Sequence, residues 1–132
     1  MRIGAGIAPL PRMNPKAQAL QERARAFLVR VCEFCESLPK SESSRRIVPQ
    51  LIDSAGSASS NYNGACRARS RKEFAAKIGV CVEEASESLE WLLSLKAANI
   101  GSPQMREELI DEANQLTAIF SASHKTATRR RD

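Results

Sequence analysis

Two cysteines, Cys32 and Cys35, form a Cys-x-x-Cys pair, a spacing used by redox-active thiols and by zinc ligands. The other two cysteines, Cys66 and Cys81, make no second close pair, and the chain has only one histidine to complete a zinc site. Cys35 follows Phe34 on the apolar side of a helical pattern, where a reduced cysteine packs well as a small apolar residue. Core packing is therefore the favoured interpretation, with a metal site or a disulfide as the alternative.

Glutamates recur along a later segment, at Glu83, Glu84, Glu87 and Glu90. Di-iron helical bundles are also rich in glutamate, but they need inward-facing Glu-x-x-His pairs, and this sequence contains none. A solvated acidic face or a partly buried ion-pair network explains these residues better. The sequence also lacks a glycine-rich phosphate loop, a Gly-x-Ser-x-Gly turn and a His-Glu-x-x-His motif, and its serines have no neighbouring base. We therefore expect no enzymatic activity, no cofactor and no bound metal.

Basic side chains form two clusters. The first precedes Lys77, is opposed only by Glu73, and consists of Arg67, Arg69, Arg71 and Lys72. The second lies at the end of the sequence and consists of Lys125, Arg129, Arg130 and Arg131. Clusters of this kind, in a chain of net charge +5, favour contact with the phosphates of nucleic acids. The alternative is a solvated turn and a solubilising tail.

These groups must be positioned by helices, because no segment shows the alternation of apolar and polar residues typical of a strand. The first helix is predicted to begin at the cap Asn14-Pro15 and to end at Leu38-Pro39. The second is predicted to begin near Arg46 or Ile47, because Pro49 suits a first helical turn. Its middle, residues 54–60, consists of small residues, which favour a close contact between helices over a linker.

Two further helices complete the pattern. A capping box, Ser70 with Glu73, predicts the start of a third helix that ends near Asn99-Ile100-Gly101. Ser102-Pro103 predicts the start of a fourth, whose apolar stripe ends at Phe120. Four amphipathic helices with short connections predict an all-α, antiparallel up-down-up-down four-helix bundle.

Length and composition agree with one globular domain, since the 132 residues are 42% apolar and 27% charged. We expect a flexible N-terminal segment over residues 1–13, the bundle over residues 14–124 and a basic disordered tail over residues 125–132. No apolar run approaches the roughly 20 residues that a membrane span needs, and residues 1–13 do not form a signal-peptide core. We therefore expect a cytoplasmic protein with reduced cysteines and no membrane partner.

Residues 50–95 carry a specific resemblance to a known family. The matching positions are Gln50, Ser54, Ser57, Asn61, Ala65, Arg69-Ser70, Phe74, Lys77, Glu84-Ala85, Glu87 and Trp91-Leu92, with residues 34–39 before them. Their joint spacing resembles the four-helix bundle proteins encoded in 23S rRNA intervening sequences, a family that includes the accessory variability determinant of diversity-generating retroelements. The likeness extends from about residue 20 to residue 120. Two positions depart from the pattern, because Gly64 replaces an acidic residue and Glu90 replaces an aromatic one.

The resemblance implies a homopentameric barrel of bundles without catalytic activity. It also implies nucleic-acid binding through basic surfaces and, in the retroelement branch, association with a reverse transcriptase that makes mutagenic cDNA. Lys77, Glu84 and Trp91 lie one heptad apart beside the apolar seam of the third helix, which independently favours a subunit boundary. With Asn61 and Glu87 they are predicted to be structural polar or interface residues, whose change to alanine lowers stability or assembly.

Nucleic acid should be held by its phosphates rather than by its bases. Phe27, Phe34, Phe74 and Phe120 all fall on predicted core stripes, which leaves no platform for base stacking. The predicted contacts are Arg67, Arg69, Arg71, Lys72, Arg129, Arg130 and Arg131. The alternative function is a homo-oligomeric scaffold for other proteins, and the sequence does not decide between RNA and DNA or identify the process served.

Overall fold

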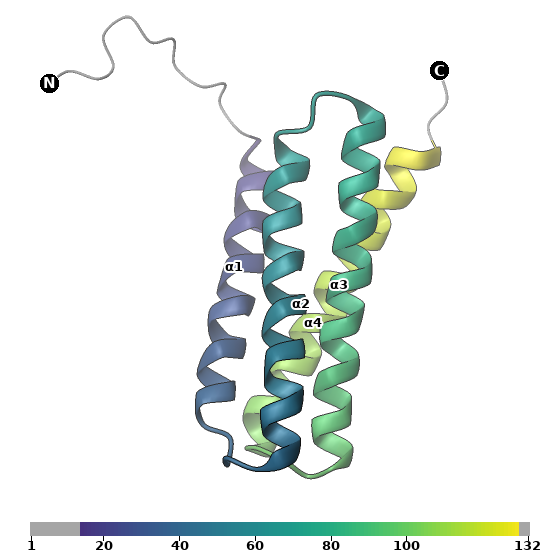
Figure 1. The fold of residues 1–132 in the computed structure, drawn as a ribbon. Helices are drawn as coiled ribbons and strands as arrows, with labels where there is room; N and C mark the ends of the chain where they lie inside the picture. Colours follow the sequence, from purple (N-terminus) through teal and green to yellow (C-terminus); the bar gives the residue numbers. More distant parts are fainter. Residues whose placement is uncertain (1–13, 130–132) are drawn as a thin grey trace, which may run out of the picture.

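The computed structural model describes residues 14–129, and over this range every regular element is a helix (Figure 1). The helices are α1 (Pro15–Glu36), α2 (Glu42–Cys66), α3 (Arg71–Ala97) and α4 (Pro103–Arg129). Consecutive helices run in opposite directions and are joined by short turns, so the predicted all-α, up-down-up-down fold is confirmed for this range. The predicted N-terminal segment, residues 1–13, and the last three residues of the predicted tail lie outside the described part of the chain.

The core is one apolar cluster that runs the length of the bundle. All four helices contribute to it through the predicted stripes, and its largest fully buried side chains include Phe27, Phe34, Leu51, Ile78, Leu92 and Phe120. Burial of such side chains stabilises the fold by about 1.5–3 kcal/mol each. The amphipathic pattern of each helix therefore decides which of its faces is turned inward.

The small residues at 54–60 form a close helix contact, as predicted. Ser54, Ala55, Ala58 and Ser59 are buried, and the Ser54 hydroxyl lies 2.7 Å from the hydroxyl of Ser88 on α3. Each hydroxyl also has a carbonyl acceptor in its own helix. One hydroxyl donates to the other while the second donates to its own carbonyl group, so neither is left without a partner. Small side chains here let the backbones of α2 and α3 pack closely at the middle of α2.

The start of α2 differs from the prediction. The helix begins at Glu42, because the Ser41 hydroxyl accepts a hydrogen bond from the Ser44 N–H and caps it. The Glu42 carboxylate in the first turn pairs with Arg45 and with Arg46. Pro49 consequently lies inside the helix, where it is exposed and where water can satisfy the carbonyl group that loses its N–H partner. A good cap and a complementary first turn outweigh that loss.

The end of α4 also differs, because the helix continues to Arg129 rather than ending at residue 124. The Thr128 hydroxyl donates to the carbonyl group of His124 within this last turn. A helix that is already nucleated gains one hydrogen bond for each added residue, so it propagates without an apolar stripe. The expectation of a disordered tail is therefore wrong for residues 125–129, and residues 130–132 lie outside the described range.

The turn after α3 uses asparagine where glycine was expected. Asn99 has the left-handed backbone angle (φ 58°) that closes the helix, and the N–H of Ile100 bonds to the carbonyl group of Leu95. Gly101 has a second positive angle (φ 93°) and lies directly over the Phe34 ring. The absence of a side chain at Gly101 therefore lets this turn press onto the core.

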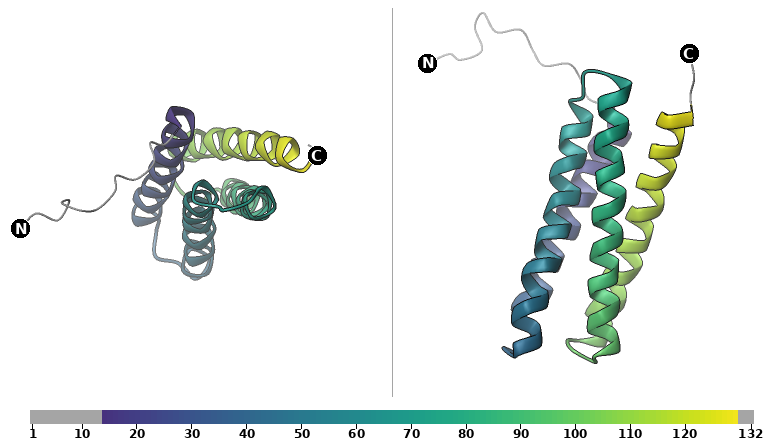
Figure 2. Two further views of the ribbon diagram at one scale, coloured as in Figure 1. Left: turned by 90° about the horizontal axis from the view of Figure 1, so that it is seen from above. Right: turned by 45° about the vertical axis from the view of Figure 1, so that its right-hand side comes forward.

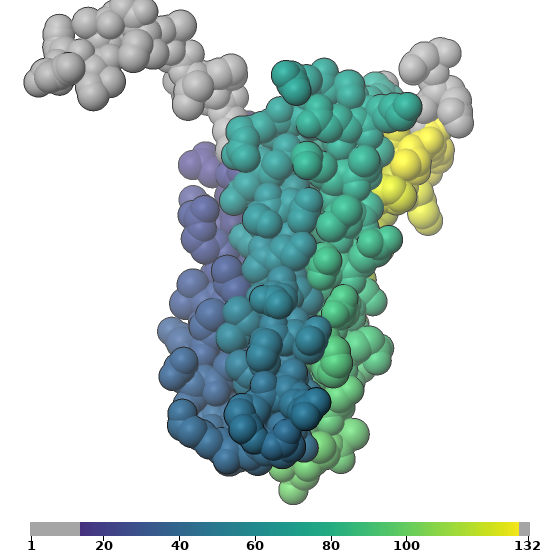
Figure 3. Space-filling view, viewed as in Figure 1, coloured from purple at the N-terminus to yellow at the C-terminus, as the bar shows by residue number. Residues whose placement is uncertain are grey.

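The bundle is tight along α2, α3 and α4 and open between α1 and α4. Helix α1 packs mainly against α2 and only weakly against α4. Viewed from above, α4 diverges from α1 toward its C-terminus (Figure 2). The space-filling view shows the last turns of α4 standing out beside α3 (Figure 3). One end of the bundle is therefore less closed than the other.

Candidate nucleic-acid interface

The turn between α2 and α3 is tightly capped. The Arg67 N–H bonds to the carbonyl group of Gly64, and the Ser70 hydroxyl accepts a hydrogen bond of 3.0 Å from the Glu73 N–H. The Glu73 carboxylate accepts from the N–H of Arg69, also at 3.0 Å, which places the reciprocal bond one residue before the cap itself. The predicted capping box is present, and the Glu73 carboxylate is engaged by a backbone N–H group rather than by a basic side chain.

The four predicted phosphate ligands of this turn, Arg67, Arg69, Arg71 and Lys72, are all exposed. Within residues 14–129 none of them takes part in an ion pair. Arg71 and Lys72 occupy the first turn of α3, where the helix dipole is also positive and disfavours a cation by about 0.3–1 kcal/mol. The turn therefore concentrates positive potential without an internal counter-charge.

The fold brings the second basic cluster to the same end of the bundle. The α2–α3 turn, the start of α1 and the C-terminus of α4 all lie at the upper end in Figure 1. Lys125 and Arg129 are exposed there, as is Lys16 at the start of α1. Arg130 and Arg131, the other predicted ligands of this cluster, lie outside the described residues. We call the exposed cations at this end, Lys16, Arg67, Arg69, Arg71, Lys72, Lys125 and Arg129, the basic end.

Three of the predicted structural polar residues line the outer seam between α2 and α3. The Asn61 amide donates to the carbonyl group of Ser57 at 2.9 Å and to its hydroxyl at 3.1 Å. Lys77 lies over Gly64, where an added Cβ would come within 3.0 Å of the lysine Cδ. With no side chain at Gly64, the alkyl part of Lys77 packs directly over the backbone of α2.

Glu84 completes this seam and is half-buried. Burial raises the pKa of its carboxyl group, the nearby charge of Glu87 raises it further, and a hydrogen bond from Ser57 partly offsets both effects. A carboxylate that is costly to ionise is suited to a packed seam or boundary. The two remaining predicted residues lie farther along α3, where the half-buried Trp91 indole N–H donates to the exposed Glu87 carboxylate at 3.3 Å.

The cysteines lie where core packing was favoured. Cys35 and Cys81 are buried, Cys32 and Cys66 are partly buried, and all four are free thiols. Burial raises the pKa of the Cys35 thiol to about 11 and that of Cys81 to about 12, which keeps both protonated near neutral pH. Among the described side chains, no group of three histidine, cysteine or carboxylate residues is arranged to hold a metal ion.

The prediction that Phe74 is a core residue is only partly right. Phe74 is only partly buried and lines a groove at the basic end, whereas Phe27, Phe34 and Phe120 are fully buried. The stripe positions Phe74 toward the other helices, but at the first turn of α3 the bundle has already begun to open. The pattern along one helix carries no signal for that opening.

Arg106, which is buried at the α3–α4 turn, carries no sequence signal that singles it out. Its guanidinium group donates to the carbonyl groups of Ile100 and Gly101, at 2.9 and 2.7 Å. Arginine often binds phosphate, but here it neutralises the negative end of the α3 dipole. Arg106 is therefore structural and lies at the opposite end from the basic cluster.

No helix within residues 14–129 is both long enough and apolar enough to cross a membrane. Comparison with known families finds a match over residues 16–122 to the model for the 23S rRNA-intervening sequence protein. A solved structure of a protein of unknown function, from the S23 ribosomal protein family of Bacteroides thetaiotaomicron VPI-5482, is similar to this chain with a TM-score of 0.74 and 22% identity. The alignment covers 83% of this chain and 98% of that one, and at this identity it shows the fold alone. No protein of curated function matches the sequence.

Proposed function

The chain belongs to the family of 23S rRNA-intervening sequence proteins, and on that premise we propose that it is a non-catalytic, basic nucleic-acid-binding accessory protein of the cytoplasm. The observation that supports this most directly is the basic end, where exposed cations from α1, the α2–α3 turn and α4 face solvent together. Arg71 and Lys72 lie at the positive end of the α3 dipole, which lowers the stability of the free protein. A phosphate bound there would offset this repulsion.

Binding should be electrostatic and largely independent of nucleotide sequence. Among the helices of residues 14–129, none presents a cluster of arginine, asparagine and glutamine suited to reading base edges along a groove. Phosphate neutralisation releases counterions, so the logarithm of the binding constant should fall linearly with the logarithm of the salt concentration. RNA and DNA should both bind, each by contacts with its backbone.

A salt titration with unrelated RNA and DNA oligomers tests the proposal. Charge reversal at Arg69 and Arg71 should weaken binding and lower the salt slope by about 2, because each cation contributes close to one phosphate contact. The fold should survive, since glutamate in place of Arg71 suits the first turn of a helix. The matched control is charge reversal at Arg45 and Arg46, which changes net charge equally at the opposite end of α2. A flat salt response, or no binding at low ionic strength, would refute the proposal.

We also propose that the protein acts as a homopentamer, with Lys77, Glu84 and Trp91 near the subunit boundary. All three side chains are half-buried in the single chain. Lys77 and Glu84 lie on the outer α2–α3 seam, and Trp91 lies farther along α3. Fivefold repetition would join weak phosphate contacts into a multivalent surface. Light scattering at micromolar concentration should give about five times the 14.5 kDa chain mass, and a value near the single-chain mass would overturn this part.

A reverse transcriptase is the partner proposed from the retroelement branch of the family. Neighbouring genes that encode a reverse transcriptase, with paired template and variable repeats, would support it. The second candidate function is a homo-oligomeric scaffold without a nucleic-acid role. The observation in its favour is a shallow patch on the outer face of α3, where Trp91 is only half-buried among Glu83, Glu87 and Glu90. Protein capture that persists when the basic end is neutralised would favour that function.

A further inference from the structure

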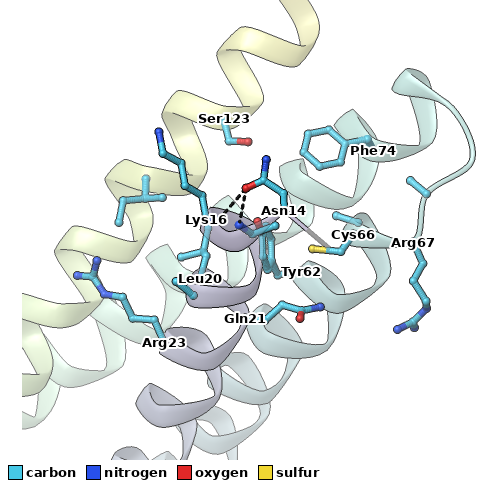
Figure 4. Close-up of a pocket in the computed structure, with 15 residues that line it drawn as sticks. Asn14, Lys16, Leu20, Gln21, Arg23, Tyr62, Cys66, Arg67, Phe74 and Ser123 are labelled. Atoms are coloured by element: carbon cyan, nitrogen blue, oxygen red, sulfur yellow. Dashed lines mark hydrogen bonds between the residues drawn. The ribbon is translucent and has the colours of Figure 1, made fainter. Parts of the chain in front are cut away.

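The open end of the bundle contains a groove of about 1300 Å³ between the start of α1, the end of α2 and the last turns of α4 (Figure 4). Its floor includes Tyr62, which is 6% exposed, and its walls include Leu20, Phe74 and Ile119. A groove of this size exceeds the ordinary gaps between packed helices, and it is somewhat larger than the roughly 300–1,000 Å³ of a typical small-ligand site.

The groove exists because α1 and α4 are held together only below it. The Arg23 guanidinium group forms a two-pronged pair with Glu112, at 2.8 and 3.0 Å, and also donates to Gln115 at 2.7 Å. Above this clasp the two helices diverge (Figure 2), and the groove between them is lined by Leu20 of α1 and Ile119 of α4. The opening is thus built into the packing.

The lining of the groove has a definite chemistry. None of its residues is an aspartate or a glutamate, whereas Lys16 and Arg67 are cations on opposite sides of it (Figure 4). Neutral hydrogen-bonding groups line it as well, at Gln21 and Ser123. The groove is continuous with the basic end, because Arg67 belongs to both. The groove therefore suits a ligand with an apolar or planar central part and hydrogen-bonding groups at the edge of that part. The ligand should also carry a negative charge on each side.

We infer that this groove receives an unpaired nucleobase of a single-stranded nucleic acid. The inference rests on the proposed nucleic-acid binding and makes it more specific. A base has an apolar face that can pack on Phe74 and a polar edge that can bond to Gln21 or Ser123. The phosphates that flank each base on its strand would meet Lys16 and Arg67. An anion with a single head group, such as a fatty acid, would use a cation on one side only.

The groove stays accessible in the assembly proposed above. It lies between α1 and α4, whereas Lys77 and Glu84 line the seam of α2 with α3, which is the opposite side of a bundle with this helix order. Nucleic acid and a neighbouring subunit would therefore not compete for the same face.

The test compares a fluorescent single-stranded RNA with a blunt duplex of the same sequence, using the full-length protein at low salt. The single strand should bind more tightly than the duplex, whose bases are stacked away. Phe74→Leu keeps an apolar side chain but removes the aromatic face, and it should weaken single-strand binding roughly fivefold or more, with little effect on the duplex. Ile119→Glu places a carboxylate in the groove and should reduce single-strand binding further.

Leu93→Glu is the matched control for Ile119→Glu, because it makes the same charge change at an exposed position on α3. Circular dichroism checks whether each variant is folded. If Ile119→Glu does not fold, Phe74→Leu still tests the inference. Equal binding of strand and duplex, with Ile119→Glu no different from Leu93→Glu, would overturn the inference and leave the proposed function intact. Absence of binding to either nucleic acid would overturn both. Saturable, Ile119-dependent binding of a fluorescent fatty acid without strand preference would assign the groove to an amphipathic anion instead.

Discussion

Replacing Gly101 by alanine should destabilise the bundle strongly, although it adds only one methyl group. A Cβ at this position would lie 2.7 Å from Leu38 Cδ2 and 2.8 Å from the Phe34 ring. Phe34 is fully buried and Leu38 is 7% exposed, so neither can move aside without disturbing the core. The positive φ of 93° is also unfavourable for any residue with a Cβ.

The expected cost follows from these two effects. A left-handed backbone costs alanine about 1–2 kcal/mol, and overpacking of a core costs about 1–3 kcal/mol. Their combination is a loss of roughly 2–5 kcal/mol in the free energy of unfolding, a large share of the stability of a domain this size. Gly56→Ala is the matched control. Gly56 lies inside α2, and a Cβ there would meet only Leu28 Cδ1 of α1, at 3.9 Å. That change should stabilise the protein by about 0.5–1 kcal/mol.

Urea unfolding followed by circular dichroism measures both variants, at one fixed subunit concentration because assembly is linked to stability. The midpoint should fall for Gly101→Ala and rise for Gly56→Ala with little change in slope. If Gly101→Ala lies within about 1 kcal/mol of wild type, or if both variants shift in the same direction, the packing argument for this turn is wrong.

Three further changes test other parts of the structure. Ser54→Ala and Ser88→Ala should each cost about 0.5–1.5 kcal/mol, because the remaining hydroxyl keeps its own carbonyl acceptor. The double variant should cost less than the sum of the two in urea unfolding, and strict additivity would show that the pair does not interact. Cys35 and Cys81 should resist iodoacetamide in the native state and react only after denaturation, as read by mass spectrometry; rapid native labelling would contradict their burial. The pKa of Glu84 is raised in the folded state, so the folded state holds this proton more tightly than the unfolded state does. Stability should therefore fall as the pH rises from 4.5, the ordinary pKa of the carboxyl group, through its raised pKa in the folded protein. Glu84→Gln should remove that part of the pH dependence in urea midpoints, and an unchanged profile would show that the carboxylate is fully solvated.

Local patterns were sufficient where a helix depends on its own residues. The stripes through Phe27, Phe34, Ile78 and Leu92 identified the inward faces, because the helical period fixes which side chains share a side. The predictions at Pro49 and at the end of α4 failed because each weighed one signal alone. The start of α2 depends on the Ser41 cap as well as on Pro49. The end of α4 depends on the helix that precedes it as well as on the end of its apolar stripe.

The family resemblance and the bundle itself were thus available from the sequence, since both rest on spacing along the chain. What the sequence could not supply is the geometry between helices. The predicted up-down-up-down order already places Arg67 and the end of the fourth helix at one end of the bundle, but only the tertiary structure shows that α4 extends as a helix to Arg129 there. Only the divergence of α4 from α1 turns Phe74 from a core residue into the wall of a groove. The distance between two helices is set by side chains far apart in sequence, so no periodicity within either helix encodes it.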